Sequence, residues 1–168
     1  MSPFSDQGLN KSRYRTIPRT LIFLFDHNHR VLLLKGSSHK KLWAGLYNGI
    51  GGHIEAGEDI LEAAQRELVE ETGIKGVALD LCGQIMIDVN ENPGIALFIF
   101  KGKFRGGFKK ESQEGELAWV DLYQLDNIPV VEDLPILLPK VVSHRIGDKV
   151  FIGKYYYNQE NGLEISIH

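Results

Sequence analysis

The chain has 168 residues, 43% of them hydrophobic and 24% charged, which is the composition of one ordinary globular domain. The formal net charge of −3 provides no bulk attraction for a nucleic acid polymer or an anionic membrane, so we expect neither as a partner. Cys82 is the single cysteine, which excludes an internal disulfide framework or a cysteine-based zinc cluster and fits a reducing cytoplasm, where we expect the protein.

Residues 1–15 are polar and contain no apolar stretch of the kind found in secretory signals. We therefore expect a flexible N-terminal segment, followed by a single domain over residues 16–168. No apolar run in the chain approaches the roughly 20 residues that a membrane-spanning helix needs.

Two strands, Thr16–Asp26 and Arg30–Lys35, are predicted from apolar, β-branched and aromatic runs that a turn-like segment joins. Residues 36–58 then combine glycine with isolated aromatic residues and show neither the helical nor the strand period. This pattern indicates a long ordered loop with a short strand around Ile50–Ile54. Loops of this length in compact domains usually carry function.

A helix is predicted from Asp59 to Thr72. Asp59 and Glu62 have the spacing of a capping box at the helix start, and Gly73 supplies the left-handed residue that commonly follows a helix.

The remaining chain alternates between strand and helix patterns. In order, we predict strands over Gly76–Val89, Ile95–Lys103 and 117–120, a short helix over 121–128, a helix from Pro135 to about His144, and a hairpin that turns at Asn161-Gly162. Strands on both sides of a central helix, with another helix late in the chain, predict an α/β sandwich with a mixed sheet.

The first predicted helix places an acid on its packing face. Leu61, Ala64 and Leu68 share one stripe at spacings of three and four, and Glu71 falls on the same stripe. A carboxylate directed into that face carries a large desolvation cost unless a cation compensates it.

Two more acids crowd beside Glu71, because Glu67 flanks the stripe and Glu70 borders Glu67. Mg²⁺ or Mn²⁺ prefers oxygen ligands, and carboxylates three and four residues apart can converge on such ions while leaving positions for water and phosphate. Arg66 can pair with Glu70 across one helical turn. The alternative is a solvated acidic face, the usual fate of glutamate-rich helices.

Paired glycines, Gly51 and Gly52, precede the helix and let the backbone approach an ion or a phosphate, with a carbonyl as a further oxygen ligand. Residues 52–74 resemble a complete Nudix box, whose required positions are filled by Gly52, Glu58, Arg66, Glu67, Leu68, Glu70, Glu71, Gly73 and Ile74.

This resemblance implies an α/β/α Nudix fold and an enzyme that hydrolyses a nucleoside diphosphate linked to another moiety, with Mg²⁺ or Mn²⁺ as cofactor. It implies that Arg66 orients the glutamates and that Glu58 supports the helix start. The metal ligands that it implies are the Gly52 carbonyl and the carboxylates of Glu67, Glu70 and Glu71.

Outside the box, most of residues 17–160 resembles the MutT-type phosphohydrolases, including the animal oxidised-purine triphosphatases. That resemblance implies that Asn48 reads the purine and that Glu114 lies near the metals as a ligand or base. The animal enzymes grip the base with a tryptophan followed by paired aspartates, whereas this chain has Glu132-Asp133 and no tryptophan in residues 128–139. Lys35 and Gly51 are further candidates for contact with the substrate.

Each assignment has a structural alternative. Asn48 also suits a turn, Glu114 can be a surface acid of a loop, and Lys35 can be an ordinary exposed lysine at a strand end. His39 and His53 have no His or Cys partners at zinc spacing, so neither is assigned to a metal.

We therefore predict a Mg²⁺-dependent hydrolase that converts a nucleoside triphosphate, with 8-oxo-dGTP among the candidate substrates, to the monophosphate and pyrophosphate. Water would attack the β phosphorus, and Glu67 or Glu114 would accept its proton. The rival predictions are a pyrophosphatase for ADP-ribose, nucleoside diphosphate sugars or dinucleotides, and a nucleotide-binding regulator without catalysis. We expect a monomer or a homodimer.

Overall fold

A mixed β-sheet forms the centre of the computed structural model, which describes residues 13–39, 43–108, 111–112 and 114–168. Its strands in these residues are β1 (Thr16–Phe25), β2 (Arg30–Gly36), β3 (Tyr47–Asn48), β4 (Leu79–Asp88), β5 (Gly94–Lys103), β6 (Glu111–Ser112), β7 (Gly115–Asp121), β8 (Phe151–Tyr157) and β9 (Leu163–Ile167).

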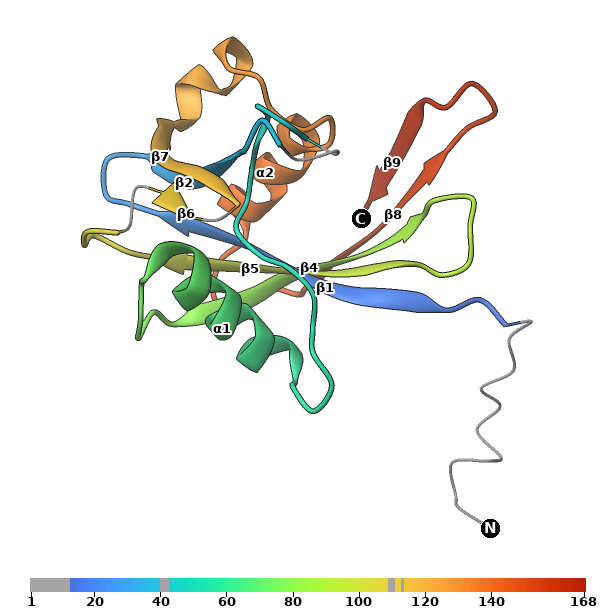
Figure 1. The fold of residues 1–168 in the computed structure, drawn as a ribbon, viewed down its shortest axis with the longest axis horizontal. Coiled ribbons are helices and arrows are strands. Elements are labelled where there is room, and N and C mark those ends of the chain that lie inside the picture. Colours follow the sequence, from blue (N-terminus) through green and yellow to red (C-terminus); the bar gives the residue numbers. More distant parts are fainter. Residues whose placement is uncertain (1–12, 40–42, 109–110, 113) are drawn as a thin grey trace.

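The strand order is β6-β7-β2-β1-β5-β4-β8-β9, and β3 pairs with β2 beside this path (Figure 1). Two pairs are parallel, β1 with β5 and β4 with β8, whereas the others are antiparallel. The predicted mixed sheet is therefore confirmed.

Helix α1 (Ile60–Thr72) covers one face of the sheet and helix α2 (Leu134–Ser143) covers the other (Figure 1). Both helices pack on β1, whose side chains alternate between the two faces. Ile22 and Leu24 belong to the apolar cluster under α1, and Leu21 and Phe23 belong to the cluster under α2. Because β1 is buried on both faces, its sequence is a continuous apolar run. The two helices and the sheet between them form the predicted α/β/α sandwich. None of the helices in the described ranges is long and apolar enough to cross a membrane.

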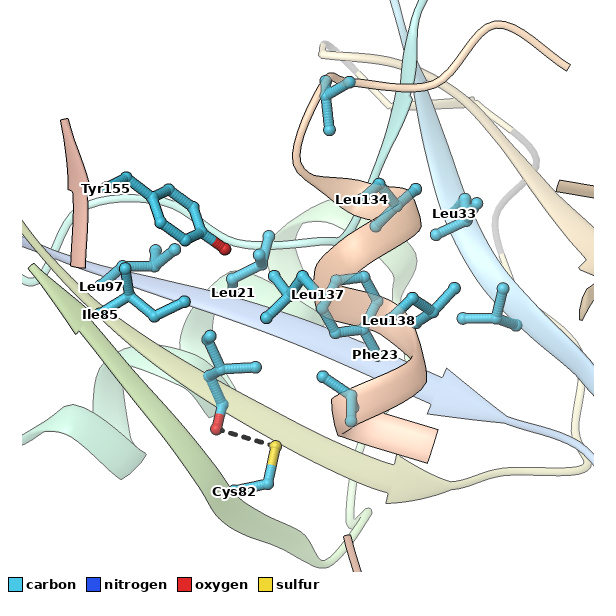
Figure 2. Close-up of a cluster of buried hydrophobic side chains, with 14 of the residues drawn as sticks. Leu21, Phe23, Leu33, Cys82, Ile85, Leu97, Leu134, Leu137, Leu138 and Tyr155 are labelled. Carbon is cyan, nitrogen blue, oxygen red and sulfur yellow. Dashed lines mark hydrogen bonds between the residues drawn. The ribbon is translucent and has the colours of Figure 1, made fainter. Parts of the chain in front are cut away.

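The cluster under α2 contains the single cysteine (Figure 2). The Cys82 thiol is fully buried and donates a hydrogen bond to the carbonyl oxygen of Ile99 over 3.3 Å. Burial raises the pKa of Cys82 to about 12. Cys82 is therefore a core residue held as a neutral thiol.

Both ends of α1 carry the predicted signals. The Asp59 carboxylate accepts from the backbone of the first turn, and the Glu62 carboxylate accepts from the Asp59 amide, which completes the capping box. Gly73 follows the helix with a φ of 74°. The predicted packing stripe is wrong at Leu61, which is 38% exposed, because the partly buried Ile60, one residue earlier, packs against the core instead.

The loop between β2 and α1 differs from the prediction. The short strand expected at Ile50–Ile54 is replaced by isolated backbone pairings of Ile50 and His53 with β1. The regular strand is β3, three residues earlier, which pairs with β2.

Later elements mostly follow the sequence patterns. The short helix expected at 121–128 is a 3₁₀ helix, η2 (Leu122–Asn127), and β7 extends beyond the expected 117–120. Helix α2 has Pro135 in its first turn, as expected, and β8 and β9 form the expected C-terminal hairpin, with Asn161 at a φ of 60° in its turn. Strand β6 was not predicted.

Residues 13–15 are fastened to the hairpin of β4 and β5. The Arg15 amide donates to Asn92 Oδ1 over 2.9 Å, Asn92 Nδ2 donates to the Arg13 carbonyl over 2.9 Å, and the Gly94 amide donates to the Arg15 carbonyl over 2.9 Å. These three residues of the expected flexible segment are therefore hydrogen-bonded to the hairpin, although they lie outside the strands, and residues 1–12 lie outside the described residues.

Lys101 on β5 caps the C-terminus of α2. Its ammonium group donates to the carbonyl oxygens of Val141 and His144, each over 2.6 Å, and of Val142 over 3.2 Å. The last carbonyls of a helix have no partners within the helix, so a cation here supplies hydrogen bonds and opposes the negative end of the helix dipole.

The Lys101→Met variant is expected to lower the free energy of unfolding by about 1–3 kcal/mol, because partly buried carbonyl oxygens lose a charged donor. Urea denaturation followed by circular dichroism measures the change. Lys103→Met is the matched control, since Lys103 is exposed at the end of the same strand and should shift the midpoint little. Equal midpoints for the two variants would contradict the capping role.

Candidate active site

The paired glycines lie against the edge of β1. The Thr20 amide donates to the Gly52 carbonyl over 2.9 Å, and the amides of Ile22 and Ile50 donate to each other's carbonyls over 2.6 and 3.1 Å. Gly51 has a φ of 148°, and a Cβ there would collide with the Thr20 carbonyl oxygen. Gly51 thus permits the close approach of loop and strand, and its contact with a substrate stays a prediction.

Gly52 supports the carboxylate of Glu67. A Cβ at Gly52 would lie 2.5 Å from Glu67 Oε1 and 2.8 Å from Oε2, so only a hydrogen atom separates the Gly52 α-carbon from the acid. The structure therefore joins the glycine loop to the acidic helix at this point.

The Gly52→Ala variant is expected to displace the Glu67 side chain by a few tenths of an ångström or more and to lower hydrolytic activity about 10-fold, as supporting-residue changes at metal sites do. Steady-state rates compare it with Gly107→Ala, where a Cβ meets no atom within 4 Å. Full activity of Gly52→Ala would contradict a requirement for close packing of Gly52 on Glu67.

Arg66 connects the acids to the loop through a set of hydrogen bonds. They are Nε to Glu58 Oε1 (2.6 Å), Nη2 to Glu58 Oε2 (3.0 Å), Nη1 to Glu67 Oε1 (2.9 Å), Nη1 to Glu70 Oε2 (3.2 Å) and Nη2 to the His53 carbonyl oxygen (2.9 Å). The pairing of Arg66 with Glu70 that the helical spacing predicted is confirmed.

The ion pair between Arg66 and Glu58 changes the pKa of both groups. The hydrogen bonds from Arg66 lower the pKa of Glu58, and those bonds, with the neighbouring Glu67, raise the pKa of Arg66. Glu58 also accepts from the Glu55 amide over 2.9 Å. Glu58 thereby fixes the loop before α1 while Arg66 stays fully charged.

The three predicted metal-binding acids differ in exposure. The Glu71 residue is 5% exposed on the packing face of α1, whereas the Glu67 and Glu70 side chains are 14% and 59% exposed. Within the described ranges, no three His, Cys, Asp or Glu side chains are grouped closely enough to hold a metal ion in their present rotamers. Arg66 holds Glu67 and Glu70 toward its own guanidinium.

The chemistry of these donors nevertheless fits a hard divalent cation. Arg66 contacts one oxygen each of Glu67 and Glu70, and a carboxylate offers about four lone-pair sites. The Gly52 carbonyl, which accepts from Thr20, has a second lone pair as well. The all-oxygen set suits Mg²⁺ or Mn²⁺ better than softer metals.

The strand that precedes Glu114 contacts this helix. Glu114 is exposed before β7, its carbonyl accepts from the Ser37 amide over 3.0 Å, and β6, two residues earlier, contacts α1. Lys35 places its ammonium group 5.7 Å from the centre of the Tyr47 ring, a cation–π contact. The structure thus brings the segment of Glu114 to α1, and contact of Lys35 with phosphate stays a prediction.

Asn48 and the acidic pair are placed near one another by backbone pairing. The Tyr47 amide donates to the Pro129 carbonyl over 2.8 Å, and the Val131 amide donates to the Tyr47 carbonyl over 3.1 Å. The chain therefore enters Glu132-Asp133 directly beside β3. Asn48 Oδ1 accepts from the Gly49 amide over 2.7 Å, as the turn alternative predicts. Recognition of the base by Asn48 stays a prediction.

The two acids of this pair have different surroundings. Glu132 is exposed, whereas Asp133 is partly buried at the start of α2, and burial raises its pKa. The phenol of Tyr155 lies beside Asp133, and burial, with the Asp133 charge, raises the pKa of Tyr155. Figure 2 shows the Tyr155 side chain directed into the apolar cluster under α2. Sequence reasoning missed Tyr155, although its inward position in an alternating strand could have indicated it.

A hollow of about 390 Å³ lies at β4, β8 and the residues before β1. Its walls are formed by Tyr14, Met86, Asp88, Lys154, Tyr155 and Tyr156. None of the predicted site residues lines it.

Comparison with known proteins agrees with the Nudix resemblance over most of the chain. The family model described as the NUDIX domain matches residues 15–141. The chain is 36% identical over 107 residues to an oxidized purine nucleoside triphosphate hydrolase of Mus musculus (63% of this chain, 65% of the relative) and 37% identical over 101 residues to that of Danio rerio (60% and 62%). It thus spans slightly less than two thirds of these relatives.

The fold is similar to a crystal structure of the mutator MutT protein from Bacillus halodurans. That comparison has a TM-score of 0.75 and 27% identity, and it covers 90% of this chain and 97% of the other. The expected fold is confirmed by this likeness.

Proposed function

We propose that this chain, which belongs to the NUDIX domain family, hydrolyses a nucleoside triphosphate to the monophosphate and pyrophosphate. The observation that carries the proposal is the Arg66 cluster, in which one guanidinium joins Glu58, Glu67 and Glu70 to the loop that packs Gly52 on Glu67. The relatives named as oxidized purine nucleoside triphosphate hydrolases support a purine substrate, with 8-oxo-dGTP as the first to test.

The residues that would hold Mg²⁺ or Mn²⁺ are Glu67, Glu70, Glu71, Glu114 and the carbonyl of Gly52. An ion bound there would neutralise charge on the phosphate oxygens and lower the pKa of the attacking water. Glu71 is the most buried of these acids, and a carboxylate at that depth carries a large desolvation cost.

The side chains have separate tasks in this mechanism. Arg66 keeps Glu67 and Glu70 oriented, and Glu67 or Glu114 accepts the proton of the water that attacks the β phosphorus. Lys35 would contact phosphate, and Asn48 with Glu132 and Asp133 would contact the base. Burial raises the pKa of Asp133, which favours its protonated form relative to that of an exposed aspartate.

A second candidate function is cleavage of ADP-ribose, a nucleoside diphosphate sugar or a dinucleotide. The observation that favours it is the absence of tryptophan from residues 128–139, beside which β3 carries Asn48. A binding module without catalysis is the weaker alternative, since the acids of the cluster are all present. The remaining proposals are a single catalytic domain over residues 16–168, a monomer or homodimer, and a cytoplasmic site of action.

Chromatography of the products distinguishes these functions. The protein and Mg²⁺ are incubated in parallel with 8-oxo-dGTP, dGTP, dATP and ADP-ribose, with the Glu71→Gln variant as control. Monophosphate with pyrophosphate, formed fastest from the oxidised nucleotide, supports the proposal. Preferred conversion of ADP-ribose to AMP and ribose phosphate supports the second candidate, and nucleotide binding without turnover of any substrate supports the binding module.

A further inference from the structure

We infer that Arg19 is a positioning residue of the active site, which acts through His53 on the glycine loop and on Arg66. This inference rests on the proposed function only in calling the acid cluster an active site. Arg19 lies on β1, outside the Nudix box, and nothing in the sequence pattern distinguishes it from the other basic residues of that strand region.

The first step is a direct contact between the two side chains. Arg19 Nη2 lies 2.9 Å from His53 Nε2, and a guanidinium can only donate, so the imidazole accepts at Nε2. The backbones of the same two residues form an antiparallel bridge. His53 is therefore held to β1 by both its side chain and its main chain.

The second step is the contact from His53 to Arg66. The His53 carbonyl oxygen accepts from Arg66 Nη2 over 2.9 Å, and Nη1 of the same guanidinium donates to Glu67 and Glu70. A series of hydrogen-bonded groups thus runs from Arg19 through His53 and Arg66 to the acids. Loosening His53 would loosen the carbonyl that fixes one side of the guanidinium.

The third step concerns the neighbour of His53. The Gly52 carbonyl accepts from the amide of Thr20, the residue after Arg19, and the Glu67 carboxylate packs against the Gly52 α-carbon. Residues 19 and 20 of β1 therefore hold residues 53 and 52 of the loop in register. Arg19 supplies the side-chain part of this connection.

Arg19 is partly buried, although its contact with His53 is exposed to solvent. Its Nε is fully buried and has no hydrogen-bond partner among the described residues. Buried donors without partners are rare because they cost free energy, so the position of this guanidinium calls for a compensating role. Holding His53 provides one.

The test compares Arg19→Met with Arg13→Met, an exposed arginine just before the same strand. In metal-free protein, hydrogen–deuterium exchange should accelerate about 10-fold for peptides covering residues 49–54 and the Thr20 amide in Arg19→Met, and should not change elsewhere in the sheet. The affinity for Mn²⁺, measured by electron paramagnetic resonance, should weaken about 10-fold. Arg13→Met should match the wild type in both.

A double-mutant cycle tests the route through His53. If Arg19 acts through that ring, Arg19→Met adds little to the loss of Mn²⁺ affinity in His53→Ala, whereas independent effects would multiply. Arg19→Lys, which keeps a donor, should recover part of the affinity. Should Arg19→Met reduce stability, the exchange pattern of Arg19→Lys provides the same comparison in a milder variant.

The inference is overturned if Arg19→Met has wild-type amide exchange in residues 49–54 and wild-type affinity for Mn²⁺. It is also overturned if exchange accelerates equally throughout the sheet, or if the losses of Mn²⁺ affinity caused by the two substitutions multiply. Failure of the proposed function has a different result. In that case the wild type hydrolyses none of the nucleotides, while the exchange and Mn²⁺ measurements still report on Arg19.

Discussion

The Glu71→Gln variant is expected to hydrolyse nucleotides about 100- to 1000-fold more slowly than the wild type while remaining folded. Glutamine has nearly the same shape as glutamate, so the packing face of α1 keeps its volume. The change removes a negative charge that is 5% exposed and that a divalent cation would otherwise compensate. A charge placed so deeply at a metal site is worth more than one in water, because the surroundings screen it less.

Steady-state rates with saturating Mg²⁺ measure this loss, and thermal unfolding confirms that the variant is folded. Glu91→Gln is the control, because Glu91 is exposed in the turn between β4 and β5 and lies outside the cluster. A Glu71→Gln variant with the wild-type rate would rule out Glu71 as a metal ligand. A slow variant that unfolds at a much lower temperature would assign the effect to packing instead.

Arg66→Met should lower activity about 10- to 100-fold and raise the Mg²⁺ concentration needed for half-maximal rate. The variant removes the donor that holds Glu58, Glu67 and Glu70, so the acids repel one another and move apart. Lysine is a poor replacement because its compact ammonium cannot reproduce the bidentate contact with Glu58.

Rates across a Mg²⁺ titration measure this effect, with Arg105→Met as a control at an exposed arginine after β5. Unchanged Mg²⁺ dependence in Arg66→Met would show that the acids hold their positions without the guanidinium, contrary to the role that its hydrogen bonds indicate.

The same ion pair predicts a pH dependence of stability. Arg66 lowers the pKa of Glu58 below its ordinary value of 4.5 in the folded state. A lowered pKa contributes stability that is fully present above the ordinary value and is lost as the pH falls through the folded value. The difference in melting temperature between wild type and Arg66→Met should therefore be constant near neutral pH and shrink below about pH 4.5.

Helix α1 could be predicted from sequence because its signals are local. Asp59 and Glu62 satisfy backbone groups within four residues, and Gly73 needs only its own φ. Strand β3 could not be predicted, since its two residues are ordered by β2 and by the Pro129–Val131 segment rather than by any period of their own. Its partners lie up to 84 positions away.

Some contacts of the candidate site could likewise be predicted from the sequence, and others could not. The contact of Arg66 with Glu70 follows from helical spacing, whereas its contacts with Glu58 and the His53 carbonyl depend on how the loop returns along β1. The contact of Arg19 with His53 joins residues 34 positions apart and has no sequence signature. The residues that hold the cluster in place therefore have weaker sequence signals than the acids themselves.

The fully buried Cys82 has a practical consequence for all of these variants. A thiol that is neutral at physiological pH and enclosed under α2 can react with a labelling reagent only when β4 separates from the core. Because the chain has no other cysteine, the labelling rate reports the opening of one known place. A mass measurement on native protein can thus divide the substitutions into those that loosen the centre of the sheet and those that change only the acid cluster of α1.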